Sequence, residues 1–278
     1  MRRSHLQTPQ SPVALVTGAS SGMGKDFASR LLAEGYVVYA AARRMERMAD
    51  LASAGCGVIA LDVTNDASMV AAVDQIIRER GRIDVLINNA GYGQYGAVED
   101  VPVDEGRRQL ETNLIGPARL IQLCLPHMRA QRSGRIFNIS SVGGKLASPL
   151  GGWYHASKFA LEGYSDALRN EVSRFGIDVI VIEPGGIESE WTNIACDEAE
   201  RYSSQGAYAD FAARFRKLQA QLGKSPPPSI ISDLIVKALK AKRPATRYHG
   251  GRLASPLLFL RRVLPDRMLD ALILRAFR

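Results

Sequence analysis

A tyrosine and a lysine four residues apart are the pair in this sequence best suited to acid–base chemistry. Tyr154 and Lys158 open a long stretch of helical period, so both side chains project from one helix face and the ammonium can lie near the phenol. A nearby cation favours the phenolate, which predicts a Tyr154 pKa below its usual value of about 10 and proton transfer near neutral pH. Ser141 ends the apolar run before this helix and can donate a hydrogen bond to a carbonyl oxygen. Such a pair is frequent on helices by chance, so the hypothesis depends on its surroundings.

The loop after the first apolar run has the composition of a phosphate-binding turn. Residues 17–24 read Thr-Gly-Ala-Ser-Ser-Gly-Met-Gly, and a helical pattern follows at once. Glycines let the backbone approach a pyrophosphate, whose charge is met by free N–H groups at the helix N-terminus. The spacing differs from the common G-x-G-x-x-G pattern, and a tight turn without a ligand is the alternative. We expect a dinucleotide to be bound by Gly18, Ser20, Ser21, Gly22, Met23 and Gly24.

Residues after the second and third apolar runs indicate which dinucleotide fits. Arg43 and Arg44 follow the second run, and no acid appears before Glu46. Arginine pairs with a 2′-phosphate, whereas an acid would hydrogen-bond a ribose 2′-OH, so NADP(H) is favoured and NAD is less favoured. Both arginines could instead be part of a solvated loop. Asp62, followed by Val63, ends the third run and could cap a turn or lie near the adenine ring.

The fourth apolar run ends in Asn-Asn-Ala-Gly at residues 88–91. In a doubly wound sheet the carboxyl ends of the strands line the ligand crevice, so Asn89, Ala90 and Gly91 should lie close to the cofactor. An ordinary turn built from Asn and Gly is the alternative.

The elements that must position these motifs alternate along the chain. Short β-branched runs without polar alternation are typical of strands that are covered on both faces, and helical patterns separate them. This order predicts a single-domain α/β fold, a doubly wound parallel sheet in a Rossmann-type three-layer α/β/α arrangement. The strand patterns are at 13–16, 36–41, 58–61, 84–87, 135–139 and 177–182, and the clearest helical patterns are at 25–34, 67–80, 117–130 and 154–174.

Composition excludes several classes of protein. The chain has 278 residues and a formal charge of +8, but eleven basic and two acidic residues fall between 237 and 278, so the body is nearly neutral and no nucleic-acid partner is expected. Three cysteines at wide spacing predict neither disulfides nor a metal site, and they fit reduced thiols in the cytoplasm. No run reaches the roughly 18 apolar residues of a membrane span.

In order and spacing these motifs resemble those of the classical short-chain dehydrogenases/reductases, over roughly residues 13–192. The resemblance implies that Tyr154 exchanges a proton, Ser141 positions the substrate oxygen, and Lys158 holds the nicotinamide ribose and tunes Tyr154. It implies that Asn113 helps hold a water-linked proton relay, and that hydride passes at the nicotinamide C4. It also implies cofactor contacts from Pro184, Gly185, Ile187 and Ser189, although the family more often has Thr where Ser189 stands.

The two ends and the region after the sixth strand are harder to interpret. We expect residues 1–12 to form a flexible segment before a cofactor-binding and catalytic domain at 13–250, within which 188–228 forms a substrate lid. Its aromatic residues could equally be plain core. Residues 251–278 form a basic amphipathic extension that packs on the domain or on a second subunit, and peripheral membrane contact is the less favoured alternative. The aromatics considered for the lid are Trp153, Trp191, Tyr202, Tyr208 and Phe211.

The leading hypothesis is an NADP(H)-dependent oxidoreductase that interconverts a carbonyl and a secondary alcohol on a hydrophobic small molecule. The alternative is a non-catalytic NADP(H)-binding sensor on the same fold. An intact set of Asn113, Ser141, Tyr154 and Lys158 argues against the sensor, because binding alone needs only the glycine loop and Arg43. The family resemblance suggests a homodimer or homotetramer.

Overall fold

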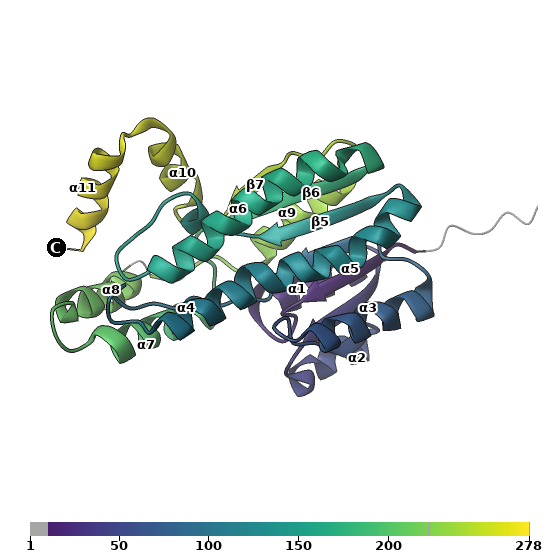
Figure 1. The fold of residues 1–278 in the computed structure, drawn as a ribbon, viewed down its shortest axis with the longest axis horizontal. Coiled ribbons are helices and arrows are strands. Elements are labelled where there is room, and N and C mark those ends of the chain that lie inside the picture. Colours follow the sequence, from purple (N-terminus) through teal and green to yellow (C-terminus); the bar gives the residue numbers. More distant parts are fainter. Residues whose placement is uncertain (1–10, 222, 278) are drawn as a thin grey trace, which may run out of the picture.

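A seven-stranded parallel sheet forms the centre of the computed structural model, which describes residues 11–221 and 223–277 (Figure 1). The strand order is β3-β2-β1-β4-β5-β6-β7, so β1 and β4 are neighbours at the point where the winding direction reverses. The strands are β1 (Val13–Thr17), β2 (Val37–Ala42), β3 (Gly57–Ala60), β4 (Val85–Asn88), β5 (Gly134–Ile139), β6 (Ile177–Pro184) and β7 (Arg247–Gly250). The predicted doubly wound sheet is confirmed.

Helices cover both faces of the sheet and enclose a core on each side. Along β1, Leu15 points to one face and Val16 to the other, as the two-residue period of a strand requires. The Leu15 face packs against α3 (Asp66–Arg80), α5 (Gly116–Gln131) and α6 (Gly152–Val172). The Val16 face packs against α1 (Gly22–Ala33), α2 (Ala49–Ala54) and α9 (Ser229–Lys240). Both faces are therefore buried, which explains the continuous apolar runs in the sequence.

The predicted elements are present with small differences at their ends, and three elements were not predicted. Helix α1 begins at Gly22 rather than Lys25, because the last glycines of the loop already belong to its first turn. The strand β7 has the polar sequence Arg-Tyr-His-Gly at the sheet edge and so gives no apolar run. Helix α4 (Val103–Leu110) is strongly polar, and α2 is only six residues long. Neither has the long apolar stripe that predicts a helix.

The chain after β6 extends beyond the sheet. Helices α7 (Trp191–Ser203) and α8 (Ala209–Gln221) lie at its carboxyl end, and α10 (Ala254–Val263) and α11 (Asp266–Ala276) follow β7. Figure 1 places α7, α8 and α11 together at one end of the molecule. The prolines 226–228 lie between α8 and α9, and Pro265 lies between α10 and α11. Most of the N-terminal segment predicted at 1–12 lies outside the described residues.

Candidate functional site

The carboxyl ends of four neighbouring strands bring the predicted motifs together. Strands β1, β4, β5 and β6 are adjacent and parallel, so the loops that follow Thr17, Asn88, Ile139 and Pro184 meet at one edge of the sheet. This edge includes the place between β1 and β4 where the strand order reverses. Ligands of doubly wound sheets bind in the crevice at such a point.

The glycine loop is held in place by the loop after β4. Thr17 Oγ1 donates to the carbonyl of Ile87 (3.2 Å) and accepts from the backbone N–H groups of Asn89 (3.0 Å) and Ala90 (3.1 Å). Asn89 Nδ2 donates in return to the carbonyl of Thr17 at 3.0 Å. Asn89 and Ala90 therefore lie beside the start of the glycine loop, and their predicted contact with the cofactor, like that of Gly91, stays a prediction.

Two glycines in this loop are required by the backbone. Gly18 has φ +68°, in the left-handed region that favours glycine, and a Cβ there would lie 2.8 Å from Asn89 Nδ2. A Cβ on Gly24 would lie 2.3 Å from the carbonyl oxygen of Gly18. The side-chain-free surface that a pyrophosphate needs is thus part of the tight packing between this loop and α1.

Arg43 and Arg44 follow β2 at the same edge, and both are exposed. Arg44 Nη2 lies 3.4 Å from Ser20 Oγ and can donate to it, so this arginine reaches over the glycine loop. Asp62 caps a turn, accepting from the backbone N–H (2.9 Å) and the hydroxyl (2.8 Å) of Thr64. Burial raises the pKa of Asp62, but the Thr64 hydrogen bonds and the charge of Arg43 outweigh it and leave the pKa below its ordinary value. The charge of Arg43 therefore acts on the Asp62 carboxyl group.

Tyr154 and Lys158 lie one turn apart on α6, and both are buried. Burial raises the pKa of Tyr154 to about 12, and a hydrogen bond with Ser141 acts in the opposite direction. Burial also lowers the pKa of Lys158 to about 8, and its ammonium donates to the carbonyl of Ile139 at 2.7 Å. The lowered Tyr154 pKa expected from the sequence is therefore wrong for this structure. Loss of solvent is the largest cause, and it outweighs the hydrogen bond with Ser141.

Ser141 rather than its neighbour faces the tyrosine. Ser141 Oγ accepts from the backbone N–H of Gly143 at 3.0 Å and lies 3.4 Å from the carbonyl of Pro184, to which it can donate. The hydroxyl of Ser140 is buried without a hydrogen-bond partner and lies close to Gly144, on the side of Glu162. The hydrogen bond between Ser141 and Tyr154 places Ser141, and not Ser140, beside the phenol.

Asn113 lies in a π-helical segment, Glu111–Ile115, between α4 and α5. Its Nδ2 donates to the carbonyl of Tyr92 (3.0 Å) and to Ser157 Oγ (3.1 Å), and its Oδ1 accepts from the Tyr92 N–H (3.2 Å). Ser157 in turn donates to the carbonyl of Tyr154 at 2.7 Å. Asn113 is thus tied to the backbone of Tyr154. The π-helical turn, a feature frequent at functional sites, was not predicted from the sequence.

His155 has a structural position that the sequence did not indicate. Its Nδ1 is 2.9 Å from the carbonyl of Gly143, and its Nε2 accepts from the backbone N–H of Ser148 at 3.1 Å. Burial lowers its pKa, which favours the neutral ring with the proton on Nδ1. His155 therefore fixes the loop at residues 143–152 against the start of α6, beside Ser141 and Tyr154.

Aromatic side chains cover Tyr154 on the side away from the sheet. The ring centroids of Tyr95 and Trp191 lie 5.7 Å and 5.2 Å from that of Tyr154, and Phe215 of α8 stacks on Tyr95 at 4.9 Å. Trp191 was expected in this cover, whereas Phe215 was not singled out. Trp153 lies elsewhere, because its ring packs against Gly106 of α4.

The loop after β6 carries the remaining predicted residues. The Gly185 N–H donates to the carbonyl of Gly250 at 2.8 Å, which continues the pairing of β6 with β7 from Pro184. Ile187 is buried, and Ser189 Oγ accepts from the Trp191 N–H at 3.3 Å, at the start of α7. Ser189 is therefore placed where the chain turns from the sheet into the aromatic cover. A contact with a nicotinamide stays a prediction for these residues.

A buried ionic cluster lies one turn along α6 from Lys158 and was missed by the sequence analysis. Glu162 accepts from Lys145 (2.7 Å) and Arg247 (2.9 Å), and Glu183 at the end of β6 lies 3.8 Å and 3.5 Å from the same two cations. Burial and the neighbouring Glu162 carboxylate raise the pKa of Glu183 to about 7. The cluster joins the loop after Ser141, α6, β6 and β7, which are the elements that position the site.

No group of three or more possible metal-ligating side chains occurs within residues 11–221 and 223–277. In the same ranges, no helix is long and apolar enough to cross a membrane.

The Glu183 carboxyl should make the stability of the protein depend on pH. Its folded pKa is raised from 4.5 to about 7, so between these values the folded state binds more protons than the unfolded state and the free energy of unfolding falls as pH rises. Glu183→Gln should flatten this dependence, since the amide does not titrate. Urea unfolding should show that the free energy of unfolding changes less between about pH 5 and about pH 8 in Glu183→Gln than in the wild type.

Glu171→Gln, an exposed position on the same helix, is the control and should keep the wild-type dependence. An equally steep pH dependence in Glu183→Gln and the wild type would contradict the assignment.

Comparison with known proteins agrees with the fold. A family model described as short chain dehydrogenase matches residues 12–199. The 3-ketodihydrosphingosine reductase of Bacteroides thetaiotaomicron is 38% identical over 263 residues, which cover 94% of this chain and 96% of that protein.

Two solved structures illustrate the same likeness with different cofactors. An actinorhodin polyketide ketoreductase with NADPH has a TM-score of 0.74 and 31% identity, covering 88% of this chain and 96% of its own. A short chain dehydrogenase/reductase from Burkholderia phymatum in complex with NAD has a TM-score of 0.78 and 25% identity, covering 91% and 92%. The chain belongs to the short-chain dehydrogenase/reductase family of oxidoreductases.

Proposed function

We propose that this protein is an NADP(H)-dependent oxidoreductase that interconverts a carbonyl and a secondary alcohol on a hydrophobic small molecule. The observation that carries the proposal is the convergence of Ser141, Tyr154 and Lys158 at the carboxyl end of β5, on the same edge of the sheet as the glycine loop. A sensor that only binds a dinucleotide needs the loop but no buried acid–base pair.

The glycine loop fits a dinucleotide. Gly18 and Gly24 let it pack tightly against Asn89, and the loop leads into the N-terminus of α1, where backbone N–H groups can meet a pyrophosphate. Bound there, the cofactor supplies or accepts a hydride at the nicotinamide C4. The residues around the strand ends bind and orient it.

The exposed pair Arg43 and Arg44 supports NADP(H) over NAD(H). The Arg44 guanidinium beside Ser20 and the exposed Arg43 next to it in the chain can offer charge-assisted hydrogen bonds to a 2′-phosphate, and no carboxylate follows β2 at this point to bind a free 2′-OH. The polyketide ketoreductase is described with NADPH, whereas the Burkholderia phymatum relative is described with NAD. Because these two proteins are described with different cofactors, the NADP(H) preference proposed for this chain rests on its own Arg43 and Arg44.

Protonation states fit a reduction in which Tyr154 is the acid. With a pKa of about 12 the phenol holds its proton at neutral pH, so it can donate that proton to a carbonyl oxygen that gains negative charge. Ser141 can donate a second hydrogen bond to the same oxygen. Lys158, with a pKa of about 8, is mostly cationic at neutral pH and favours the phenolate that forms.

The aromatic cover supports an apolar substrate. Tyr95, Trp191 and Phe215 surround the outer side of Tyr154, and the apolar cluster they belong to continues into α7 and α8. We propose that residues 188–228 form the substrate lid. The Bacteroides relative is named as the reductase of a 3-keto compound, which agrees with a ketone as substrate.

The proposal also includes an oligomeric state and a cellular location for this protein. Family resemblance favours a homodimer or homotetramer. Cys56, Cys124 and Cys196 are buried and unpaired, which supports a reducing, cytoplasmic location.

Replacing Tyr154 by Phe should abolish turnover and spare cofactor binding. Removal of the general acid lowers kcat/KM for ketone reduction by about 10³-fold, whereas the NADPH dissociation constant should stay within about twofold. The measurements are steady-state NADPH oxidation with hydrophobic ketones and NADPH fluorescence titration.

Tyr164→Phe is the matched control, since it removes a phenol hydroxyl from another face of the same helix and should leave both quantities unchanged. Full turnover in Tyr154→Phe, or loss of NADPH binding with it, would reject the assigned role.

Replacing Arg43 by Ala should weaken NADPH far more than NADH. A lost charge-assisted contact with a phosphate is worth about 1.5–3 kcal/mol, which raises the NADPH dissociation constant by roughly 10- to 100-fold. The NADH constant should hardly move, because its ribose has no 2′-phosphate. Arg78→Ala, on the exposed side of α3, controls for the change in net charge. An equal loss for both dinucleotides would reject the 2′-phosphate contact.

A further inference from the structure

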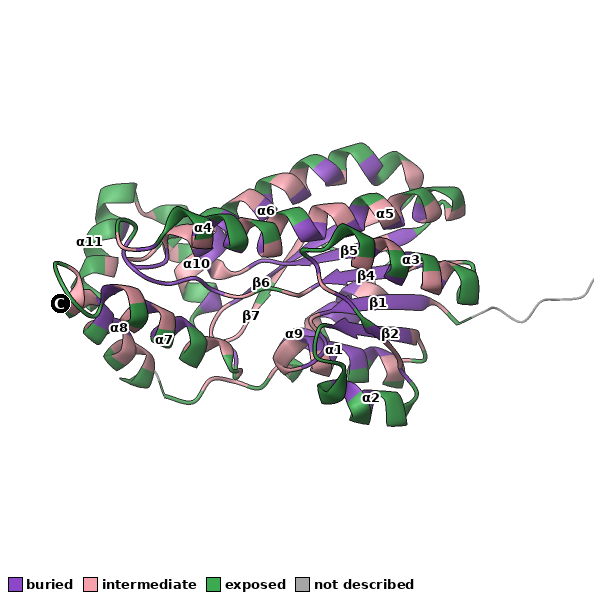
Figure 2. Cartoon of the chain, turned by 60° about the horizontal axis from the view of Figure 1, so that its bottom comes forward, coloured by how far each residue is buried: buried purple, intermediate pink, exposed green. Residues whose placement is uncertain are grey.

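Helices α10 and α11 form a pair that is little buried by the rest of the chain. Between residues 254 and 276 only Ala254 and Leu269 are buried. Figure 1 shows the two helices arching away from the sheet, and Figure 2 shows mainly exposed positions on α11. Such a length of helix without a covering layer is unusual in a folded domain, because most helical stability comes from packing of an apolar face.

Each helix of this pair exposes large apolar side chains that are four residues apart. Phe259 (63% exposed) and Val263 (51%) are four residues apart on α10, and Met268 (58%) and Leu272 (45%) are four apart on α11. Residues at this spacing share one helix face, so each helix presents an apolar stripe to solvent. Leu253 is exposed just before α10, and Leu274 is exposed on the other side of α11, toward α8. An exposed apolar surface of this kind marks an interaction site.

Basic side chains accompany the apolar stripes. Arg262 adjoins Val263 on α10, and Arg275 lies three residues after Leu272 on α11, on the same face. Asp270 is two residues from both Met268 and Leu272, which places it on the opposite side of α11. Asp266, the other acid of the pair, is held by Arg261 at 2.6 Å. Each helix therefore exposes apolar groups together with positive charge.

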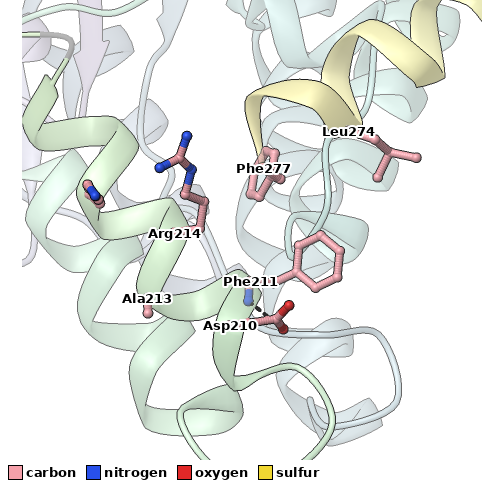
Figure 3. A pocket seen from close by; sticks show the side chains of 7 residues that line it. Asp210, Phe211, Ala213, Arg214, Leu274 and Phe277 are labelled. Atoms are coloured by element: carbon pink, nitrogen blue, oxygen red, sulfur yellow. Dashed lines mark hydrogen bonds between the residues drawn. The ribbon is translucent and has the colours of Figure 1, made fainter.

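The pair lies at the same end of the molecule as the proposed substrate lid. Phe277 packs against Phe211 of α8 with ring centroids 5.8 Å apart, and Arg214 Nε donates to the carbonyl of Ala276 at 3.2 Å. A hollow of about 780 Å³ opens between α8 and α11 (Figure 3). Its walls join the apolar Leu274, Phe277 and Phe211 with the basic Arg214 and Lys217.

We propose that α10 and α11 dock this protein on the surface of an anionic lipid bilayer. The helices lie in the interface, the exposed apolar side chains enter the acyl region, and the arginines meet the phosphate groups of the lipids. The lipid is preferred over a second copy of the chain, because a two-fold contact would bring this basic face against itself. The inference does not depend on the reaction proposed above.

Vesicle flotation of the full-length protein tests the proposal. Vesicles of phosphatidylcholine with about one third phosphatidylglycerol should carry the protein upward at low salt, and pure phosphatidylcholine should carry at least about tenfold less. High salt should weaken the binding by a similar factor, since it screens the charges.

Two double variants separate the apolar and the basic contributions. Phe259→Ser with Met268→Ser removes apolar insertion, and Arg262→Glu with Arg275→Glu reverses the charge; each should lower the bound fraction by about tenfold or more. The matched controls are Val103→Ser on α4, which is 55% exposed, and Lys242→Glu with Arg243→Glu, exposed at the opposite end of the sheet. Both controls should bind like the wild type.

The proposal fails if the folded protein does not float with anionic vesicles at low salt. It also fails if the control charge reversal weakens binding as much as the variant in α10 and α11, because net charge alone then explains the effect. If light scattering shows instead that Phe259→Ser with Met268→Ser dissociates an oligomer while no variant binds vesicles, the face belongs to a second copy of the chain.

Discussion

A lysine ammonium withdrawn from water is the constraint on which the rest of the site depends. Burial of an unpaired cation is costly, so Lys158 requires a fixed acceptor, and the carbonyl of Ile139 supplies it at 2.7 Å. That carbonyl is available because it belongs to the last residue of β5, at the open carboxyl end of the parallel sheet. The position of the ammonium, and with it the face of α6 that carries Tyr154, is thus set by the sheet itself.

The second support for this arrangement lies behind the lysine. Glu162 follows Lys158 by one turn, and its charge favours the protonated lysine against the effect of burial. Glu162 is itself buried and held by Lys145 and Arg247, which come from the loop after Ser141 and from β7. Removing one partner of a buried pair leaves an uncompensated charge. The cluster therefore binds the elements of the site to one another.

The sequence predicted the parts of this site whose chemistry depends on spacing along the chain. The i, i+4 relation of Tyr154 and Lys158 and the glycines of the loop are local patterns, and the fold places them as expected. The cluster around Glu162 could not be predicted, because its members are distant in sequence and each alone reads as a solvated charge. The same holds for the π-helical turn at Asn113, which tertiary hydrogen bonds to Tyr92 and Ser157 stabilise.

The effect of burial on pKa values was the other property that could not be predicted from the sequence. Spacing alone suggests that Lys158 lowers the pKa of Tyr154, but the magnitude of desolvation depends on the cover from Tyr95 and Trp191, which only the tertiary structure reveals. Polar edge elements such as β7 were missed for a related reason. They are stabilised by pairing with β6 and carry no apolar run of their own.

Transfer of deuterium from the cofactor to the product is the most direct test of the central claim that this site moves a hydride and a proton. The protein is incubated with NADPH deuterated at both positions of the nicotinamide C4 and with a panel of hydrophobic ketones, and the products are analysed by mass spectrometry. The account predicts an alcohol that carries one deuterium on its carbinol carbon, formed in equal amount to NADP. Tight binding of NADPH without deuterium in any product of the panel would contradict it.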